Sequence, residues 1–253
     1  MAKGLCLLRD GEGDAFLTAG STGALIVGCS SRIYKVKIPG IRRCAIGGVL
    51  PLKKPVLLMD SGANVEVSPE ELVQFAHMGN AYMKGVFGIK EPEIGLVNNG
   101  AEETKGTALY VEAHKLLKEE KEIRFIGNVE GRDIPLGDAD VILCDGFVGN
   151  VILKLSEGFG KFISKELKSM LGGSLRGKLA ALLIYSDLKK LKKRLSYDTH
   201  GGAPILGTAY PVVKAHGSSK ATAVKNAALA AKKCHEAKVC RWIAKAAEEK
   251  KGE

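Results

Sequence analysis

Short apolar runs recur along the chain, and longer segments with helical periodicity separate them. The runs lie at residues 14–19, 56–60, 94–98, 123–127, 140–145 and 210–216. Most of them lack the polar alternation of a strand with one solvated face, so they predict strands buried on both faces of a parallel sheet. The segments between them predict helices at 22–33, 69–87, 104–120, 149–171, 177–195 and 218–248. This alternation predicts an α/β fold in a single domain over residues 1–253.

The helix expected at 69–87 carries the clearest local start signal. Ser68 stands at the N-cap position, Pro69 follows at the first helical position, and Glu71 comes three residues after the cap. A hydroxyl at the cap and a carboxylate three residues later can satisfy two free backbone N–H groups reciprocally. We therefore expect a capping box at this helix start.

Each predicted strand runs into a polar, glycine-rich turn. These turns are AGSTG (19–23), DSGAN (60–64), NNGAEETKG (98–106), GNVEGRD (127–133), DGFVGN (145–150) and HGSS (216–219). Because the carboxyl ends of parallel strands share one edge of a sheet, we expect the six turns to meet at one crevice, where open α/β folds bind ligands. Turn conformation explains the Gly, Asn and Asp content, but it does not require Lys105, Glu130, Arg132 or His216.

The turn DGFVGN at 145–150 places a carboxylate and a carboxamide between a buried strand and a buried helix. Gly146 and Gly149 are free to take positive φ angles, which suits a turn from strand to helix. The turn alone does not need Asp145 and Asn150 together, so this pair is a candidate for chemistry.

The charge is concentrated in one segment. The formal net charge is +10, and residues 161–195 hold ten Lys and Arg against Glu166 and Asp187, which supplies +8 of it. Because the rest is close to neutral and aromatic residues are only 6%, a nucleic-acid surface is not indicated. The stretch 167–195 is a basic amphipathic segment that favours either an anionic membrane surface or an apolar seam for a partner subunit.

Several classes of site are disfavoured by spacing. GGSLRGKL at 172–179 resembles a P-loop, but Leu179 replaces the hydroxyl that should hold Mg²⁺, and no G-x-G-x-x-G follows a strand. The six cysteines form no C-x-x-C pair, and no His, Cys and carboxylate cluster has metal-ligand spacing, so no metal is expected. The start lacks a secretory apolar region and no apolar run approaches about 20 residues, which predicts a cytoplasmic protein.

AGSTG also has the context of a nucleophile elbow, with Ser21 between a strand and a helix. Asp145 or Asp198, with His200 or His216, would complete a Ser, Asp, His order. An α/β serine hydrolase is therefore an alternative. The elbow follows the first strand of the chain, whereas the hydrolase pattern needs several strands before it.

Taken together, the loop motifs resemble one family. MDSGANVEVSPEELVQFAHMGNAYMKGVFGI, GLVNNGAEETKG, FIGNVEGRDI, DGFVGNVILKLSEG, and YDTHGGAPILG with HGSSKATAVKNA are similar to the bacterial phosphate acyltransferases of phospholipid synthesis, the PlsX family. These motifs run in order over nearly the whole chain. The resemblance implies a phosphotransacetylase-like, isocitrate dehydrogenase-like three-layer α/β/α sandwich with a protruding helical hairpin, and a homodimer.

The same resemblance implies transfer of a fatty acyl group from acyl carrier protein to inorganic phosphate, giving acyl phosphate without a cofactor. Phosphate attacking a thioester needs positive charge, donors for the developing oxyanion and exclusion of water. Lys105 is the expected charge, and Asn150 is the expected donor beside a positive helix N-terminus. The expected substrate-binding residues in the motif loops are Ser21, Thr22, Asp60, Asn64, Asn128, Arg132, Asp145 and His216.

Two departures from the family pattern matter. Asn is usual in the family where this chain has Ser21, which favours a loop donor over a nucleophile. The family also begins with an additional βα portion carrying an Asp-Ala-Met-Gly-Gly-Asp stretch, and this chain starts after it. That difference favours a third alternative, a non-catalytic binding protein derived from the enzyme.

Overall fold

An eight-stranded sheet forms the centre of the molecule. The computed structural model describes residues 1–52, 54–194, 201–217 and 219–249. The strands are β1 (Phe16–Thr18), β2 (Ala45–Pro51), β3 (Pro55–Met59), β4 (Glu93–Asn98), β5 (Arg124–Glu130), β6 (Val141–Leu143), β7 (Ala203–Leu206) and β8 (Val212–Lys214). Their order is β1-β8-β7-β2-β3-β6-β4-β5. All six expected strands are present, as β1, β3, β4, β5, β6 and β8.

β2 and β7 were not expected from the sequence. β2 contains two adjacent glycines, and β7 is four residues long with Pro204 inside it, so both carry weak strand signals. Each is held by pairing with segments distant in the chain. β2 pairs antiparallel with both β3 and β7, and β7 pairs antiparallel with β8.

These antiparallel pairings change where the turns lie. Three successive reversals, from β8 to β7 to β2 to β3, make β1 and β8 antiparallel to β3 and to its parallel neighbours β6, β4 and β5. The expectation that all six turns share one edge of the sheet is therefore wrong. The turns after β3, β4, β5 and β6 leave from one edge, and those after β1 and β8 leave from the opposite edge.

Helices cover both faces of the sheet. They are α1 (Ala2–Arg9), α2 (Thr22–Ser30), α3 (Pro69–Phe87), α4 (Ala108–Glu119), α5 (Gly146–Gly172), α6 (Leu175–Leu183), α7 (Tyr185–Arg194), α8 (Ala221–Glu236) and α9 (Val239–Glu249), with a 3₁₀ turn at Ile134–Leu136. α3 packs on Leu57 and Met59 with α4 and α9, whereas α5 packs beside Leu58 on the other face. The three-layer α/β/α sandwich is confirmed.

The start of α3 confirms the expected capping box. The Ser68 hydroxyl accepts from the Glu71 N–H at 3.3 Å, and the Glu71 carboxylate accepts from the Ser68 N–H at 2.9 Å. The helix ends at Gly88, whose φ of 70° suits a residue without a side chain. The expected bounds 69–87 match the observed helix.

Two expected helices are each divided in two. The segment 177–195 forms α6 and α7 with a break at Ile184, and the segment 218–248 forms α8 and α9, separated by Ala237 and Lys238, whose φ is 55°. Neither break carries Gly or Pro, so no local signal predicts where these helices end. The third expected helix, 104–120, is shorter and spans Ala108–Glu119.

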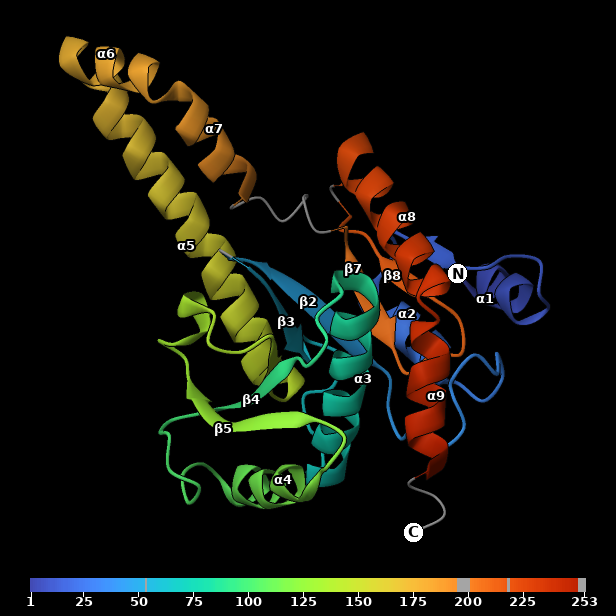
Figure 1. Ribbon diagram of the computed structural model, residues 1–253. Coiled ribbons are helices and arrows are strands. Elements are labelled where there is room, and N and C mark those ends of the chain that lie inside the picture. Colours follow the sequence, from blue (N-terminus) through green and yellow to red (C-terminus); the bar gives the residue numbers. More distant parts are fainter. Residues whose placement is uncertain (53, 195–200, 218, 250–253) are drawn as a thin grey trace.

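α5 extends away from the sheet and carries the predicted protruding hairpin. Its 27 residues span about 40 Å at 1.5 Å per residue. Figure 1 shows α5 rising from the sheet, α6 crossing its far end and α7 returning beside it. We call the outer part of α5 together with α6 and α7 the helical arm. Among the described helices, none is long and apolar enough to cross a membrane.

Candidate active site

A cavity of about 880 Å³ lies on the α5 face of the sheet. Ile46 and Gly48 of β2 form its floor, α5 residues between Asn150 and Ser164 form one wall, and residues 214–217 at the end of β8 lie in the other, with Thr22 of α2. Three expected site residues line it together, which are Thr22, Asn150 and His216. Loops from opposite edges of the sheet therefore still meet, because the cavity spans the face of the central strands.

Asp60 organises the loop beneath this cavity. Its side chain is fully buried, and its carboxylate accepts from the N–H groups of Ile46, Gly62, Ala63 and Asn64 and from the Asn64 amide. Burial raises the pKa of the Asp60 carboxyl, and these donors oppose the rise. The Asn64 amide also donates to the Cys44 carbonyl at 2.9 Å. Asp60 and Asn64 thus shape the loop, while Ser61 and Gly62 face the cavity.

The stretch DGFVGN is helical rather than a turn, because α5 already begins at Gly146. Neither Gly146 nor Gly149 takes a positive φ angle, so the turn does not use that freedom of glycine. Both glycines instead allow close packing: a side chain at Gly146 would meet the Asn64 backbone, and one at Gly149 would meet the Asp60 carbonyl. Because neither glycine has a side chain, the first turn of α5 can pack directly against the 60–64 loop.

Asp145 caps α5, and Asn150 reaches the cavity. One Asp145 carboxylate oxygen accepts from the Val148 N–H at 2.8 Å, and the other accepts from the Tyr110 hydroxyl at 2.7 Å. Asn150 lies in the first turns of the same helix and packs against Gly62. The position of Asn150 therefore depends on the cap formed by Asp145 and on Tyr110 of α4.

Lys105 lies outside the cavity lining. Its loop follows β4, where the Asn98 amide donates to the Lys105 carbonyl at 2.9 Å and the Lys105 side chain is exposed and packs beside Gly100. Among the described residues, those that line the cavity with Asn150 do not include Lys105. Since β4 neighbours β6 and Tyr110 follows the loop, the two loops are adjacent at the same edge of the sheet.

Asn128 of β5 and Arg132, which follows β5, contact residues that do not line the cavity. The Asn128 amide donates to the Glu102 carbonyl at 2.7 Å, and its oxygen lies 3.0 Å from the buried His114 ring. Asn128 therefore fastens the loop that carries Lys105. The Arg132 side chain is exposed and pairs with the Glu130 carboxylate at 2.6 Å, away from the cavity lining.

The serine hydrolase alternative gains no support from these positions. The Ser21 hydroxyl caps α2 and accepts from the Ala24 N–H at 3.5 Å. The Asp145 carboxylate is occupied by Tyr110 and Val148. Of the remaining candidates, His216 lines the cavity, whereas Asp198 and His200 lie outside the described residues.

Lys214, at the end of β8, is a cavity residue that the sequence analysis did not select. It is partly buried, and its ammonium donates to the Ala215 carbonyl at 2.7 Å. Desolvation lowers the pKa of this Lys214 ammonium. Within the described ranges no carboxylate forms an ion pair with it. It lies in the predicted strand 210–216, and an isolated lysine in a strand gives no local signal of a binding role.

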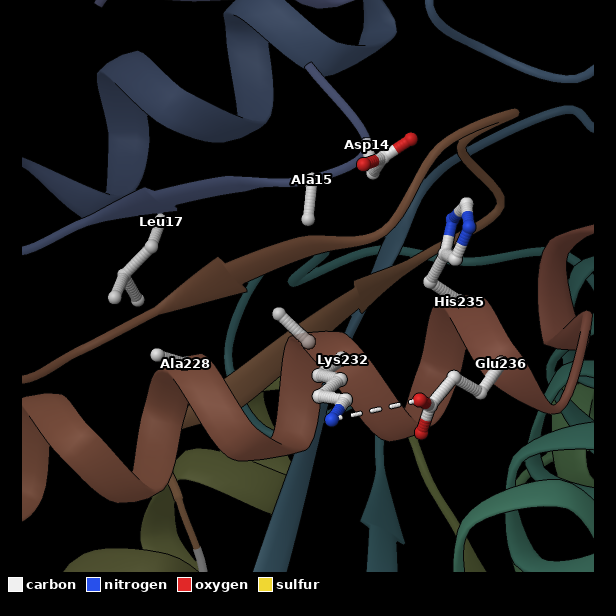
Figure 2. Close-up of a pocket in the computed structure, with 8 residues that line it drawn as sticks. Asp14, Ala15, Leu17, Ala228, Lys232, His235 and Glu236 are labelled. Atoms are coloured by element: carbon white, nitrogen blue, oxygen red, sulfur yellow. Dashed lines mark ion pairs between the residues drawn. The ribbon is translucent and has the colours of Figure 1, made fainter.

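A second, smaller cavity of about 430 Å³ lies between β1 and α8. Figure 2 shows Leu17, Ala15 and Ala228 facing one another across it, with the Lys232 and Glu236 pair on the α8 side. It contains none of the expected site residues. Within the described residues, no group of three or more His, Cys, Asp or Glu could hold a metal ion.

Comparison with solved structures gives the class of fold. A phosphotransacetylase from Staphylococcus aureus aligns with a TM-score of 0.55 at 18% identity, covering 93% of this chain and 67% of its own. A branched-chain phosphotransacylase from Enterococcus faecalis V583 aligns with a TM-score of 0.57 at 16% identity, covering 92% and 78%. At such identities the likeness establishes the phosphotransacetylase-like fold alone.

Sequence comparison gives the family. The family model described as "Fatty acid synthesis protein" matches residues 1–242. The phosphate acyltransferase of Clostridium acetobutylicum is 47% identical over 98% of this chain and 74% of its own length. That of Thermoanaerobacterium thermosaccharolyticum is 49% identical over 96% and 72%. The chain belongs to this fatty acid synthesis family, the PlsX family that the loop motifs indicated, and it is an acyltransferase.

Proposed function

We propose that this enzyme transfers a fatty acyl group from acyl carrier protein to inorganic phosphate in the cavity beside α5. The product would be acyl phosphate for phospholipid synthesis. The observation that carries the proposal is the meeting of Asn150, Thr22, His216 and the Lys214 ammonium in one cavity. A cation with no carboxylate partner in the described structure suits an anionic acceptor.

The proposed reaction needs no cofactor. A phosphate oxygen attacks the thioester carbonyl carbon, so a C–O bond forms, the C–S bond breaks, and the thiolate leaves with the carrier and takes a proton. Negative charge develops on the carbonyl oxygen during the attack. An amide near a helix N-terminus can donate to that oxygen, which is the role proposed for Asn150.

We assign the other expected residues by their surroundings. Thr22 and His216 line the cavity and are proposed acceptor contacts, and Ser21 starts the helix that presents Thr22. Asp60, Asn64 and Asp145 hold the loop and the helix that frame the site. Lys105 is proposed as a second cation reached from the adjacent loop, with Asn128 fastening that loop and Arg132 at its outer side.

The direct test is phosphate-dependent loss of acyl thioester from acyl carrier protein. We expect this 253-residue chain to consume the thioester only when phosphate is present, with acyl phosphate as the product. Thioester that persists at all phosphate concentrations would reject the proposal in favour of the non-catalytic binding protein. Labelling of Ser21 by a fluorophosphonate would instead support the hydrolase.

We further propose a homodimer that docks through α5. Its Phe147, Val151, Leu155, Phe159 and Phe162 side chains are each half or more exposed and form a stripe along one side of the helix. An exposed apolar patch of this kind marks an interface. Leu155→Glu with Phe159→Glu should convert a dimer to a monomer in sedimentation, and a monomeric parent chain would contradict the proposal.

The helical arm is the proposed contact with an anionic membrane surface, which would make the enzyme cytoplasmic and peripherally bound. α6 exposes Leu175, Leu179, Leu182 and Leu183 beside Arg176 and Lys178. Apolar and basic side chains together suit the boundary of an anionic bilayer. Gln at Lys189, Lys190, Lys192 and Lys193 should release the protein from anionic vesicles, and unchanged binding would count against this role.

A further inference from the structure

The cavity is elongated along α5. Asn150, Lys154, Glu157, Lys161 and Ser164 line it at intervals of three or four residues, so they share one side of the helix. At 1.5 Å per residue, Asn150 and Lys161 are about 16 Å apart along the axis. The space is therefore a groove that runs from the proposed reacting end toward the helical arm.

The α5 wall of this groove is polar. Leu153 is the one large apolar side chain that α5 contributes to the described lining, and the other α5 residues there are Asn, Lys, Ser, Glu and Gly. The apolar stripe through Val151, Leu155 and Phe159 lies outside the described lining. The opposite wall, with Ile46, Val49, Ala203 and Ala215, is apolar. An occupant that carries both amide and methylene groups can use both walls, whereas an alkyl chain would offer no hydrogen bonds to the polar side chains of α5.

The groove is open at its middle because Gly160 has no side chain. A side chain there would meet no other protein atom within 4 Å, so packing does not require glycine. Glycine is also a much poorer helix former than alanine, so local helix stability does not favour it here. Gly158, two residues earlier, is equally unobstructed but lies outside the described lining of the groove.

Positive charge marks the outer end of the groove. Lys154, nearer the reacting end, pairs with Glu157 at 2.9 Å, whereas Lys161 forms no ion pair with any described residue. Lys165 and Lys168 follow on the exposed continuation of the helix. Of the two α5 lysines in the lining, an acidic group that enters from the arm side would meet Lys161 before Lys154.

We propose that this groove holds the extended phosphopantetheine arm of the acyl donor, with its thioester at Asn150 and its phosphodiester at Lys161. This inference rests on the proposed function. Thirteen bonds separate phosphorus from sulfur in that arm. An extended peptide has three backbone bonds per residue, so the arm is as long as four to five residues, or about 15 Å. The length of the arm matches the distance from Asn150 to Lys161. Its two amides would lie beside the polar side chains of α5, and its negatively charged phosphate would lie at Lys161.

The experiment compares Gly160→Leu with Gly158→Leu, two changes of equal size on the same helix. Leu is a better helix former than Gly, so both variants should fold, which thermal melting checks. The probes are S-octanoyl and S-hexadecanoyl 4′-phosphopantetheine, and the readout is Kd by calorimetry. We expect Gly160→Leu to weaken binding of both probes about tenfold or more, with Gly158→Leu unchanged, because loss of several contacts in a filled groove has this scale.

A second variant tests the charged end independently. Lys161→Gln should weaken binding of the phosphopantetheine probes about tenfold, the scale of one lost charge-assisted hydrogen bond, and leave the corresponding pantetheine probes unaffected. Unchanged Kd in both Gly160→Leu and Lys161→Gln would overturn the proposal. A loss confined to the hexadecanoyl probe would also overturn it, since that result places the acyl tail in the groove.

Turnover is measured separately, so the two proposals fail in different ways. Groove-dependent binding without phosphate-dependent turnover would reject the proposed reaction and keep the groove. Phosphate-dependent turnover with an unchanged KM for acyl carrier protein in Gly160→Leu would reject the groove and keep the reaction.

Discussion

Removing the Tyr110 hydroxyl tests how α5 is fixed at the site. Tyr110→Phe deletes the donor 2.7 Å from the Asp145 carboxylate, and the Asp145 N–H also loses its acceptor at 3.2 Å. Burial and the neighbouring Asp145 raise the pKa of the Tyr110 phenol above its usual range, so it stays a donor at working pH. The buried Asp145 carboxylate would keep the Val148 N–H as its remaining hydrogen-bond donor among the described residues.

The expected cost follows from that geometry. A hydrogen bond to a charged group contributes about 1.5–3 kcal/mol, so the free energy of unfolding should fall by about 2 kcal/mol. In a chain of this size that lowers Tm by about 4–8 °C. Turnover should fall as well, because Asn150 is carried by the same helix turn.

The assay is thermal unfolding followed by circular dichroism, with Tyr185→Phe as the control. Tyr185 is 65% exposed at the start of α7 and loses the same atom with no buried partner. We expect the control to melt with the parent protein. A Tyr110→Phe variant that also melts with the parent would refute the role of this hydrogen bond in holding α5.

Three further predictions concern Lys214 and Asn128. Lys214→Gln should raise the KM for phosphate about tenfold with a smaller change in the KM for the acyl donor, measured by titrating each substrate; equal changes would exclude a phosphate contact. Because burial lowers the pKa of Lys214, acetic anhydride at mildly alkaline pH should acetylate it faster than exposed lysines, and phosphate should protect it, as mass spectrometry of peptides reports. Asn128→Ala should speed amide hydrogen exchange in residues 99–107, and unchanged exchange would show that its bond to the Glu102 carbonyl does not fasten the loop.

The sequence predicted the elements whose signals are local. The capping box at Ser68 and Glu71 depends on four successive residues, and the buried strands depend on runs of five to seven. β2 and β7 depend instead on partners far along the chain, since Ala45 pairs with Leu206. Their antiparallel pairing reverses β1 and β8, which is why the direction of those two strands could not be predicted from local patterns.

The residues of the candidate site likewise divide into those that local motifs predict and those that depend on the fold. The motif DGFVGN identified Asp145 and Asn150, and the structure places Asn150 in the cavity. The Asp60 carboxylate accepts hydrogen bonds from five N–H groups. This could not be predicted from the sequence, because one of the donors is Ile46 from another strand. Lys214 was missed because an isolated lysine in a strand gives no signal until the fold buries it.

The most direct test of the central claim, that phosphate attacks the thioester beside Asn150, is acyl phosphate formation trapped as the hydroxamate. The measurement compares the parent chain, Asn150→Ala and Lys105→Ala at saturating phosphate. We expect Asn150→Ala to lower kcat about 100-fold, because loss of one oxyanion donor has an effect of this size. The kcat of Lys105→Ala then shows whether the loop after β4 contributes as much to the rate. A parent rate retained by Asn150→Ala would contradict the claim.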